Sequence, residues 1–280
     1  MARRFPQMKA DVADVSLLAR RFSQIKAIFH SHFSFLIFHF LLVNLFLLSI
    51  QSPTVACLSE EETHHCTKVL RHKEGDEIHG IDGKGSYVKG IIQAISKKET
   101  QISIQEIQEN WGEKPQKIVL AISPLRQKDR FEWLIEKAVE LGIDEIVPII
   151  CKNTITENVK PERLQQIIIS ATKQCKRAKI PLLHTPILVE KWLESVKLGE
   201  KNIGLLAFCE TENSLSHYHT QIQTAKIVYF VIGPEGDFSQ KEVEIAAQKG
   251  FEIVSLGKSR LRTETAGLFA LSAIKLLQGW

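Results

Sequence analysis

The apolar run Ile227 to Ile232, which stops abruptly at the turn Gly233-Pro234-Glu235-Gly236, is the feature that most constrains the fold of this chain. An uninterrupted apolar run bounded by turn residues is typical of a strand that is buried on both faces of a parallel sheet. Glycines in the turn allow a backbone to approach a ligand closely. Because open α/β sheets bind ligands beyond the carboxyl ends of their strands, this turn is a candidate binding site.

A second loop of the same kind follows. The short strand predicted over Glu252 to Leu256 runs into Gly257 and then into a basic, threonine-rich segment that ends at Ala266. Between the two loops, Ser239 and Glu242 have the spacing of a capping box, which predicts the start of a helix. Two such loops after neighbouring strands predict one pocket. The G-x-G-x-x-G spacing is absent, so a nicotinamide or flavin cofactor is disfavoured.

Upstream of these loops the chain alternates strands with helices. Further strands are predicted over Lys117 to Ile122, Ile146 to Cys151 and Ile203 to Phe208, and helices over Lys128 to Leu141 and Pro161 to about Arg177. Apolar residues of the first of these helices fall on one face. Strands that alternate with helices indicate an α/β fold, with a parallel sheet and helices on its faces.

The part that precedes this pattern is rich in β-structure. Strands are predicted over 45–50, 77–81, 87–95 and 101–107, with glycine and aspartate turns between them, and Ser59 is a predicted N-cap of a short helix. These elements indicate a small antiparallel barrel or meander. The polar stretch Asn110 to Pro115 predicts the boundary between two domains, 43–112 and 115–280.

Composition sets only mild limits on function. The net charge of the 280 residues is +4, which does not by itself require a polyanionic partner. The five cysteines are an odd number without a C-x-x-C pair, which argues against a disulfide framework and against a zinc or other metal site. A reducing, cytoplasmic location fits this usage.

The first 42 residues do not fit either domain. The segment Phe33 to Ile50 is almost entirely apolar and long enough to span a bilayer, and Thr54-Val55-Ala56-Cys57 resembles a signal or lipoprotein cleavage site. The long basic lead, and the histidine and asparagine residues in or beside the run, favour a non-domain extension, 1–42, over a membrane anchor. The alternative is a membrane-tethered or exported module that binds a nucleotide-like ligand without catalysis.

The two glycine loops also carry a family resemblance. Gly233 to Ser239 with Glu242, followed by Leu256-Gly257 and by Arg260 to Ala266, resembles the paired signature of the RsmE-type 16S rRNA (uracil-N3)-methyltransferases, members of the SPOUT class. The resemblance extends upstream through Phe131–Gly142, Gln174–Arg177 and the pair His64-His65, and covers about Val43 to Trp280. Asp237 departs from it, since the family usually has glycine there. The other departures are Ser259, Leu261 and Lys152-Asn153-Thr154.

This resemblance implies a C-terminal, trefoil-knotted parallel-sheet SPOUT methyltransferase domain preceded by a small PUA-like β-barrel. It also implies S-adenosylmethionine as cofactor and methylation of N3 of a uridine in 16S rRNA within the small ribosomal subunit. The partner would be a second copy in a homodimer packed through the knotted domain, and no membrane is expected unless Phe33 to Ile50 is a true anchor. The location would be cytoplasmic.

The resemblance, with the residue types, also gives candidate site residues. Cofactor contacts are expected from Leu206, Gly233, Pro234, Glu235, Gly236, Leu256, Gly257, Leu261, Arg262, Thr263, Thr265 and Ala266. Contacts with RNA are expected from Arg71, Lys73, Lys128, Arg130, Lys176 and Arg177, with His64 and His65 structural or facing RNA.

Catalytic roles are expected for Arg262 and Glu264, with Glu235 a second candidate base. Each has a structural alternative. Arg262 would form a salt bridge with Glu264, either glutamate would complement a helix dipole, and Thr263 or Thr265 would cap the last helix.

Overall fold

The computed structural model describes residues 44–112 and 114–279. The extension 1–42, with most of the apolar segment from Phe33, lies outside the described residues. The architecture below is that of the compact unit that begins at Leu45. No helix in the described part of the chain is both long enough and apolar enough to cross a membrane.

The predicted barrel is confirmed. Its strands are β1 Leu45–Ser52, β2 Val55–Leu58, β3 Glu77–Ile81, β4 Tyr87–Ile95 and β5 Thr100–Gln108. They close in the order β1-β2-β5-β4-β3, with β1 and β3 parallel and the other neighbours antiparallel. The sequence did not predict β2. Its Cys57, part of the supposed cleavage site, pairs with Ser49 on β1 and Gln101 on β5.

A short helical segment follows β2. Helix α3 Glu60–His64 continues into one π-helical turn, His65–Val69. The hydroxyl of Ser59 accepts a hydrogen bond from the backbone N–H of Glu62 at 3.3 Å, which confirms the predicted N-cap. The His65 ring meets the buried Phe46 edge-on, with the ring centroids 6.1 Å apart, so this segment packs on the barrel core.

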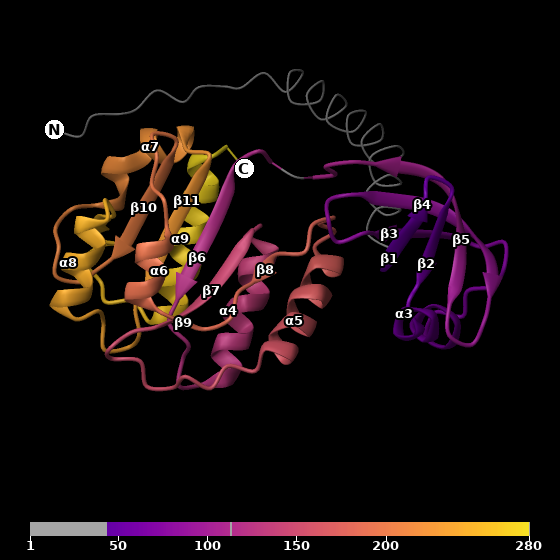
Figure 1. Ribbon diagram of the computed structural model, residues 1–280, viewed down its shortest axis with the longest axis horizontal. Coiled ribbons are helices and arrows are strands. Elements are labelled where there is room, and N and C mark those ends of the chain that lie inside the picture. The colour runs from indigo at the N-terminus through magenta and orange to yellow at the C-terminus, as the bar shows by residue number, and fades with distance from the viewer. Residues whose placement is uncertain (1–43, 113, 280) are drawn as a thin grey trace, which may run out of the picture. The chain divides into compact units, whose positions relative to one another are not determined.

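The second half is a parallel α/β sheet, as predicted (Figure 1). Its strands are β6 Lys117–Ile122, β7 Glu145–Ile150, β8 Leu182–Leu183, β9 Ile187–Leu188, β10 Asn202–Ala207, β11 Ile227–Ile232 and β12 Glu252–Val254. The order is β12-β10-β11-β6-β7-β8, with β9 also beside β7, and all pairings are parallel. The predicted run Ile227 to Ile232 therefore lies in the interior of the sheet. Whether the chain is knotted stays a prediction.

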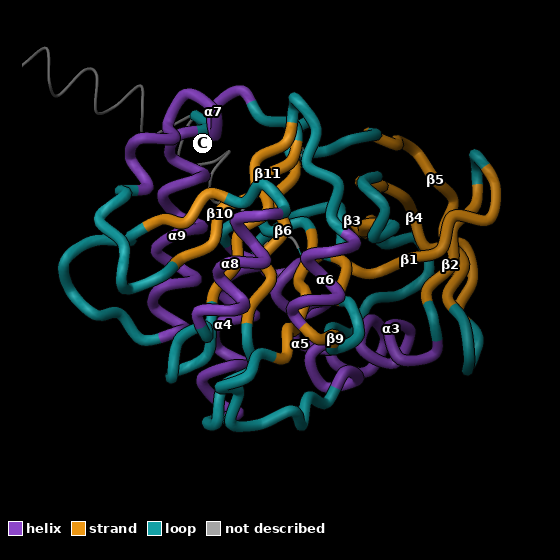
Figure 2. The backbone as a smooth tube through the Cα atoms, turned by 60° about the vertical axis from the view of Figure 1, so that its left-hand side comes forward, coloured by secondary structure: helices purple, strands orange, loops and turns teal. Residues whose placement is uncertain are grey.

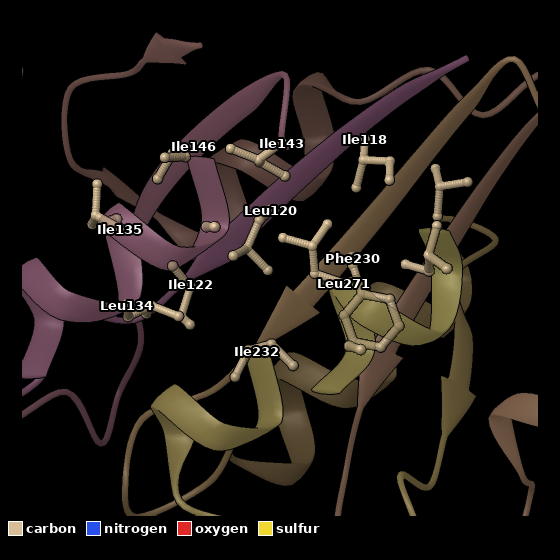
Figure 3. Close-up of a cluster of buried hydrophobic side chains, with 14 of the residues drawn as sticks. Ile118, Leu120, Ile122, Leu134, Ile135, Ile143, Ile146, Phe230, Ile232 and Leu271 are labelled. Atoms are coloured by element: carbon tan, nitrogen blue, oxygen red, sulfur yellow. The ribbon is translucent and has the colours of Figure 1, made fainter. Parts of the chain in front are cut away.

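Helices cover both faces of this sheet (Figure 2). They are α4 Lys128–Glu140, α5 Pro161–Gln174, α6 Val189–Ser195, α7 His219–Thr224, α8 Gln240–Gln248 and α9 Thr263–Leu277, with a 3-10 turn over Leu215–Tyr218. Helices α4, α5, α7 and α9 share one core with the sheet, and α6 and α8 share the other. In the larger core, Leu134 of α4 and Leu271 of α9 approach Ile122 and Phe230 of the sheet (Figure 3).

The parallel strands all begin at one side of the sheet, here called the amino edge, and end at the opposite side, the carboxyl edge. The two sides carry different groups. At the amino edge, the carboxylate of Glu145 lies 2.7 Å from Nζ of Lys117 and 2.9 Å from Nε2 of His184. Burial acts to raise the pKa of Glu145, but the hydrogen bonds from Lys117 and His184 outweigh it and hold the pKa below its usual value. At the carboxyl edge, the loops after β6, β7, β10, β11 and β12 converge. The candidate site lies there.

Candidate functional site

A cavity of about 900 Å³ opens among these carboxyl-edge loops. This volume lies in the range of sites that hold a small molecule or cofactor. The walls come from all five loops and the start of α9. The lining residues are Leu125, Arg126, Gln127, Arg130, Ile155, Ala207, Phe208, Cys209, Glu210, Ile232, Gly233, Pro234, Glu235, Gly236, Asp237, Ser255, Leu256, Gly257, Lys258, Ser259, Arg260, Leu261, Arg262, Thr263, Glu264 and Ala266. The prediction of one pocket from two glycine loops agrees with this arrangement.

The loop after β11 is the hub of the site. On one side, Oε1 of Glu235 accepts a hydrogen bond from the backbone N–H of Arg126, 3.2 Å away in the loop after β6. Farther along, Nδ2 of Asn153 in the loop after β7 donates to the carbonyl oxygens of Gly236 at 3.2 Å and Asp237 at 3.0 Å. The hub loop is thus fixed to loops that come from distant parts of the sequence.

Glu242 adds a buried link to the same hub, with only 1% of the residue exposed. Its Oε2 accepts hydrogen bonds from the backbone N–H of Ser239 at 2.7 Å and from the Ser239 hydroxyl at 2.8 Å. The predicted capping box at the start of α8 is therefore confirmed. The other oxygen, Oε1, accepts from the backbone N–H of Lys152 at 2.8 Å. One carboxylate thus caps a helix and holds the loop after β7.

The glycines of the two loops serve different needs. Gly236 allows close approach, because a Cβ there would lie 3.1 Å from Cβ of Asn153. Gly257 has φ of 128°, a conformation that side-chain-bearing residues rarely adopt, and a Cβ there would meet nothing within 4 Å. The second loop therefore needs its glycine for the backbone path, and the first needs it for space.

The start of α9 corrects two expectations. The helix begins at Thr263, and Arg262 occupies the N-cap position with extended backbone. Thr263 and Thr265 lie inside the first turn, so their predicted capping role is wrong. The predicted partner of Glu264 in a structural salt bridge was Arg262, but its ion-pair partner in the structure is Arg130 on α4.

A second cavity of about 670 Å³ adjoins the first and shares Arg130, Arg260, Leu261, Arg262 and Glu264 with it. Asp129, Trp133 and Thr265 complete its lining. The shared wall carries three guanidinium groups and one nearly buried carboxylate, since Glu264 is 9% exposed. The two cavities therefore share a wall of mostly charged side chains.

The cofactor candidates from the sequence are gathered at the larger cavity, with two exceptions. Leu206 is 0% exposed inside the sheet, where it packs in the core on the side of α6 and α8. Thr265 lines the second cavity instead. Glu264 and Arg262, the catalytic candidates, line both cavities.

The basic candidates for RNA contacts are scattered. Arg130 lines both cavities, and Lys128 is exposed at the start of the same helix. Arg71 and Lys73 are exposed on the barrel after the π-helical turn. The guanidinium of Arg177 serves the fold, because Nη1 donates to the Ile143 carbonyl at 2.6 Å and Nη2 lies 3.9 Å from a carboxylate oxygen of Asp144. Lys176, beside Arg177, has φ of 57°, and burial holds the pKa of its ammonium below the usual value.

Several lining residues were not singled out from the sequence. Ala207 ends β10, Phe208 to Glu210 follow it, and Leu125 to Gln127 lie in the loop after β6, so the rule that pointed to Gly233 would have found them. Trp133 and Asp129 lie on a helix and carry no comparable signal.

The lining of the larger cavity combines both signs of charge with apolar and backbone surface. Carboxylates come from Glu210, Glu235, Asp237 and Glu264, and cations come from Arg126, Arg130, Lys258, Arg260 and Arg262. The Cys209 thiol has a raised pKa, first because of burial and then because of its hydrogen bond to Asp237. The five cysteines are free thiols, and within residues 44–112 and 114–279 no cluster of side chains could hold a metal ion.

Both halves of the chain match models of known families. The family described as RNA methyltransferase domain matches residues 112–275, and the one described as RNA methyltransferase PUA domain matches residues 58–105. The ribosomal RNA small subunit methyltransferase E of Rickettsia conorii is 28% identical over 232 residues, which cover 81% of this chain and 91% of that relative.

Two crystal structures show the same architecture. A probable rRNA-methyltransferase from Porphyromonas gingivalis is 37% identical with a TM-score of 0.71, and covers 80% of this chain and 93% of its own. The ribosomal RNA small subunit methyltransferase E from Neisseria gonorrhoeae, bound to S-adenosyl methionine, is 29% identical with a TM-score of 0.74, and covers 84% of this chain and 98% of its own.

Proposed function

This chain belongs to the RsmE-type RNA methyltransferase family, as its paired glycine loops predicted, and we propose that it methylates N3 of a uridine in small-subunit ribosomal RNA with S-adenosylmethionine. The observation that carries the proposal is the cavity of about 900 Å³ walled by the two glycine loops. The sulfonium group of the cofactor, when bound, supplies the methyl group.

The lining of the larger cavity suits this cofactor. The cofactor is cationic at sulfur and at its ammonium group, and Glu210 and Glu235 offer carboxylates of opposite charge. Arg260 offers a partner for its carboxylate. The backbone of Leu256 and Gly257 lines the cavity and can serve as donor and acceptor for an adenine.

The second cavity suits the acceptor nucleotide. Enzymes that modify a base take it out of the helical stack and into a pocket. Arg262 is exposed at the N-cap of α9 and can donate hydrogen bonds to uracil oxygens. Glu264 is the carboxylate in the wall that the two cavities share, and we assign it as the base that accepts the proton from N3–H. Positioning and charge placement then carry most of the rate.

The remaining contacts with RNA come from three exposed cations and from the partly exposed Arg130. Arg71 and Lys73 on the PUA-like barrel, with Lys128 and Arg130 on α4, bind phosphates and therefore supply affinity without sequence choice. Binding by such contacts weakens steeply with salt.

The active form is a homodimer that packs through α4 and α9. Large apolar side chains are exposed on both helices, with Trp133 48%, Phe269 49% and Leu276 75% exposed. Phe269 and Leu276 lie two helical turns apart on one face of α9. The dimer works in the cytoplasm, where ribosomal subunits are assembled and where its five free thiols stay reduced.

The decisive test uses purified protein, methyl-labelled S-adenosylmethionine and small ribosomal subunits that lack the modification. Digestion of the RNA after incubation is expected to release labelled 3-methyluridine. If the cofactor binds but label appears in another nucleoside or not at all, the assigned reaction is wrong. The matched control is Arg262→Ala, which is expected to bind the cofactor and to transfer little label.

A further inference from the structure

We propose that Asp237 is a positioning residue, whose carboxylate fixes the distance between the two loops that hold the cofactor in the proposed methyltransferase. The inference rests on that proposed function for the identity of the ligand. The bridge itself rests on contacts in the fold.

The carboxylate of Asp237 joins two neighbouring strand ends. Its Oδ2 accepts a hydrogen bond from the backbone N–H of Cys209 at 3.2 Å, and its Oδ1 accepts from the backbone N–H of Phe238 at 2.9 Å. Cys209 follows β10, whose last residue Ala207 is paired with Ile232 at the end of β11. Both Asp237 and Cys209 line the larger cavity, so this bond links two of its walls.

The backbone of Asp237 indicates that its side chain has a purpose. Its φ of 60° lies in the left-handed region, which glycine adopts without steric penalty and other residues adopt with strain. Aspartate tolerates this strained conformation, and both of its carboxylate oxygens are bonded to backbone N–H groups. It thus supplies two hydrogen-bond acceptors that glycine lacks.

Asn153 holds the same loop through its backbone carbonyl groups. Its Nδ2 donates to the carbonyl oxygens of Gly236 and Asp237, and its Cβ leaves no free space at Gly236. The hub loop is therefore fastened to the loop after β7 on one side and to the loop after β10 on the other. A site that is ordered before binding does not lose further loop entropy when the ligand enters.

The variant Asp237→Gly removes the carboxylate bridge and leaves the left-handed backbone conformation at residue 237 without strain. Glycine suits the φ of 60°, so the variant is expected to fold and to unfold within a few degrees of the wild type. Loss of the bridge is expected to speed hydrogen exchange at the Cys209 amide about tenfold. It is also expected to weaken binding of S-adenosylmethionine and of S-adenosylhomocysteine, each by about tenfold in calorimetry. Asp237→Asn, which tolerates the backbone and keeps one acceptor oxygen, is expected to fall between.

Glu212→Gln is the matched control, because Glu212 is an exposed acid on the same loop as Cys209 and is not among the residues that line the larger cavity. It is expected to change neither exchange nor binding. Wild-type affinity in Asp237→Gly would overturn the positioning role. A loss confined to the cationic S-adenosylmethionine would also overturn it, because the carboxylate would then act by direct contact. If the wild type bound neither ligand, the proposed function would fail, and exchange at Cys209 would still decide whether the bridge orders the loops.

Discussion

Nη1 of Arg130 on α4 lies 3.5 Å from Oε1 of Glu264 in the first turn of α9, and both residues belong to the wall that the two cavities share. The pair leaves the neighbouring Arg262 exposed toward both cavities. Glu264 therefore has a structural cation close by, while Arg262 can approach a substrate. The two arginines therefore have different roles, and we expect different effects when each is replaced.

Replacing Arg262 with alanine is expected to lower methyl transfer at saturating cofactor by about a hundredfold, because a donor aimed at developing charge in a pocket contributes several kcal/mol. The melting temperature is expected to change by only about 1 °C, since an exposed side chain adds little to stability. Single-turnover kinetics and calorimetry check the two effects. Arg262→Lys, which keeps the charge but loses the forked donors, is expected to recover only part of the rate. If the loss of rate came with a comparably large loss of stability, the arginine would have only a structural role.

The Arg130–Glu264 pair is expected to contribute about 1 kcal/mol of coupling energy to stability, because Arg130 is partly exposed and its charge is screened by solvent. Urea unfolding of Arg130→Ala, Glu264→Gln and the double variant measures this coupling. Glu264→Gln should also lose most of the methyl transfer that Arg130→Ala retains, if the carboxylate takes the proton from N3. Equal rates in the two single variants would remove Glu264 from that role.

The sequence predicted the elements that burial determines. A strand in the middle of a parallel sheet must be apolar on both faces, and β11 therefore reads as an unbroken apolar run. The capping box Ser239–Glu242 was visible because it depends on residues three positions apart. The barrel was predicted from its turns, but β2 was missed because three of its four residues, Val55 to Cys57, looked like part of a processing site.

Contacts between loops could not be predicted in the same way. The approach of Asn153 to Gly236 depends on the strand order β11-β6-β7, which no local pattern carries. The second bond of Glu242, to Lys152, and the pairing of Glu264 with Arg130 depend on the same order. The sequence thus identified both glycine loops of the site by residue type. Which side chain contacts each loop depends on the order of the strands in the sheet.

Gly80 is expected to be essential to the barrel, because a Cβ at this position on β3 would lie 2.4 Å from Cδ2 of Leu48 and 2.8 Å from the carbonyl oxygen of Phe46. The backbone cannot yield within a closed sheet, so Gly80→Ala should destabilise the protein by about 2–3 kcal/mol. Gly199→Ala is the control, since a Cβ there would meet nothing within 4 Å. Urea unfolding followed by circular dichroism measures both. Similar midpoints for the two variants would contradict the close packing of β1 against β3.

The Glu145 carboxylate at the amino edge of the sheet is expected to make the stability of the protein depend on pH. Its pKa is lowered in the fold, so its contribution is present above the ordinary value of 4.5 and is lost as the pH falls through the lowered value. Glu145→Gln should therefore cost about 1 kcal/mol at neutral pH and progressively less below pH 4.5. Urea midpoints measured from neutral to acidic pH test this. Glu200→Gln, at an exposed loop position, should leave the curve unchanged. A gap between Glu145→Gln and the wild type that stays constant on acidification would mean that the carboxylate is not the titrating group.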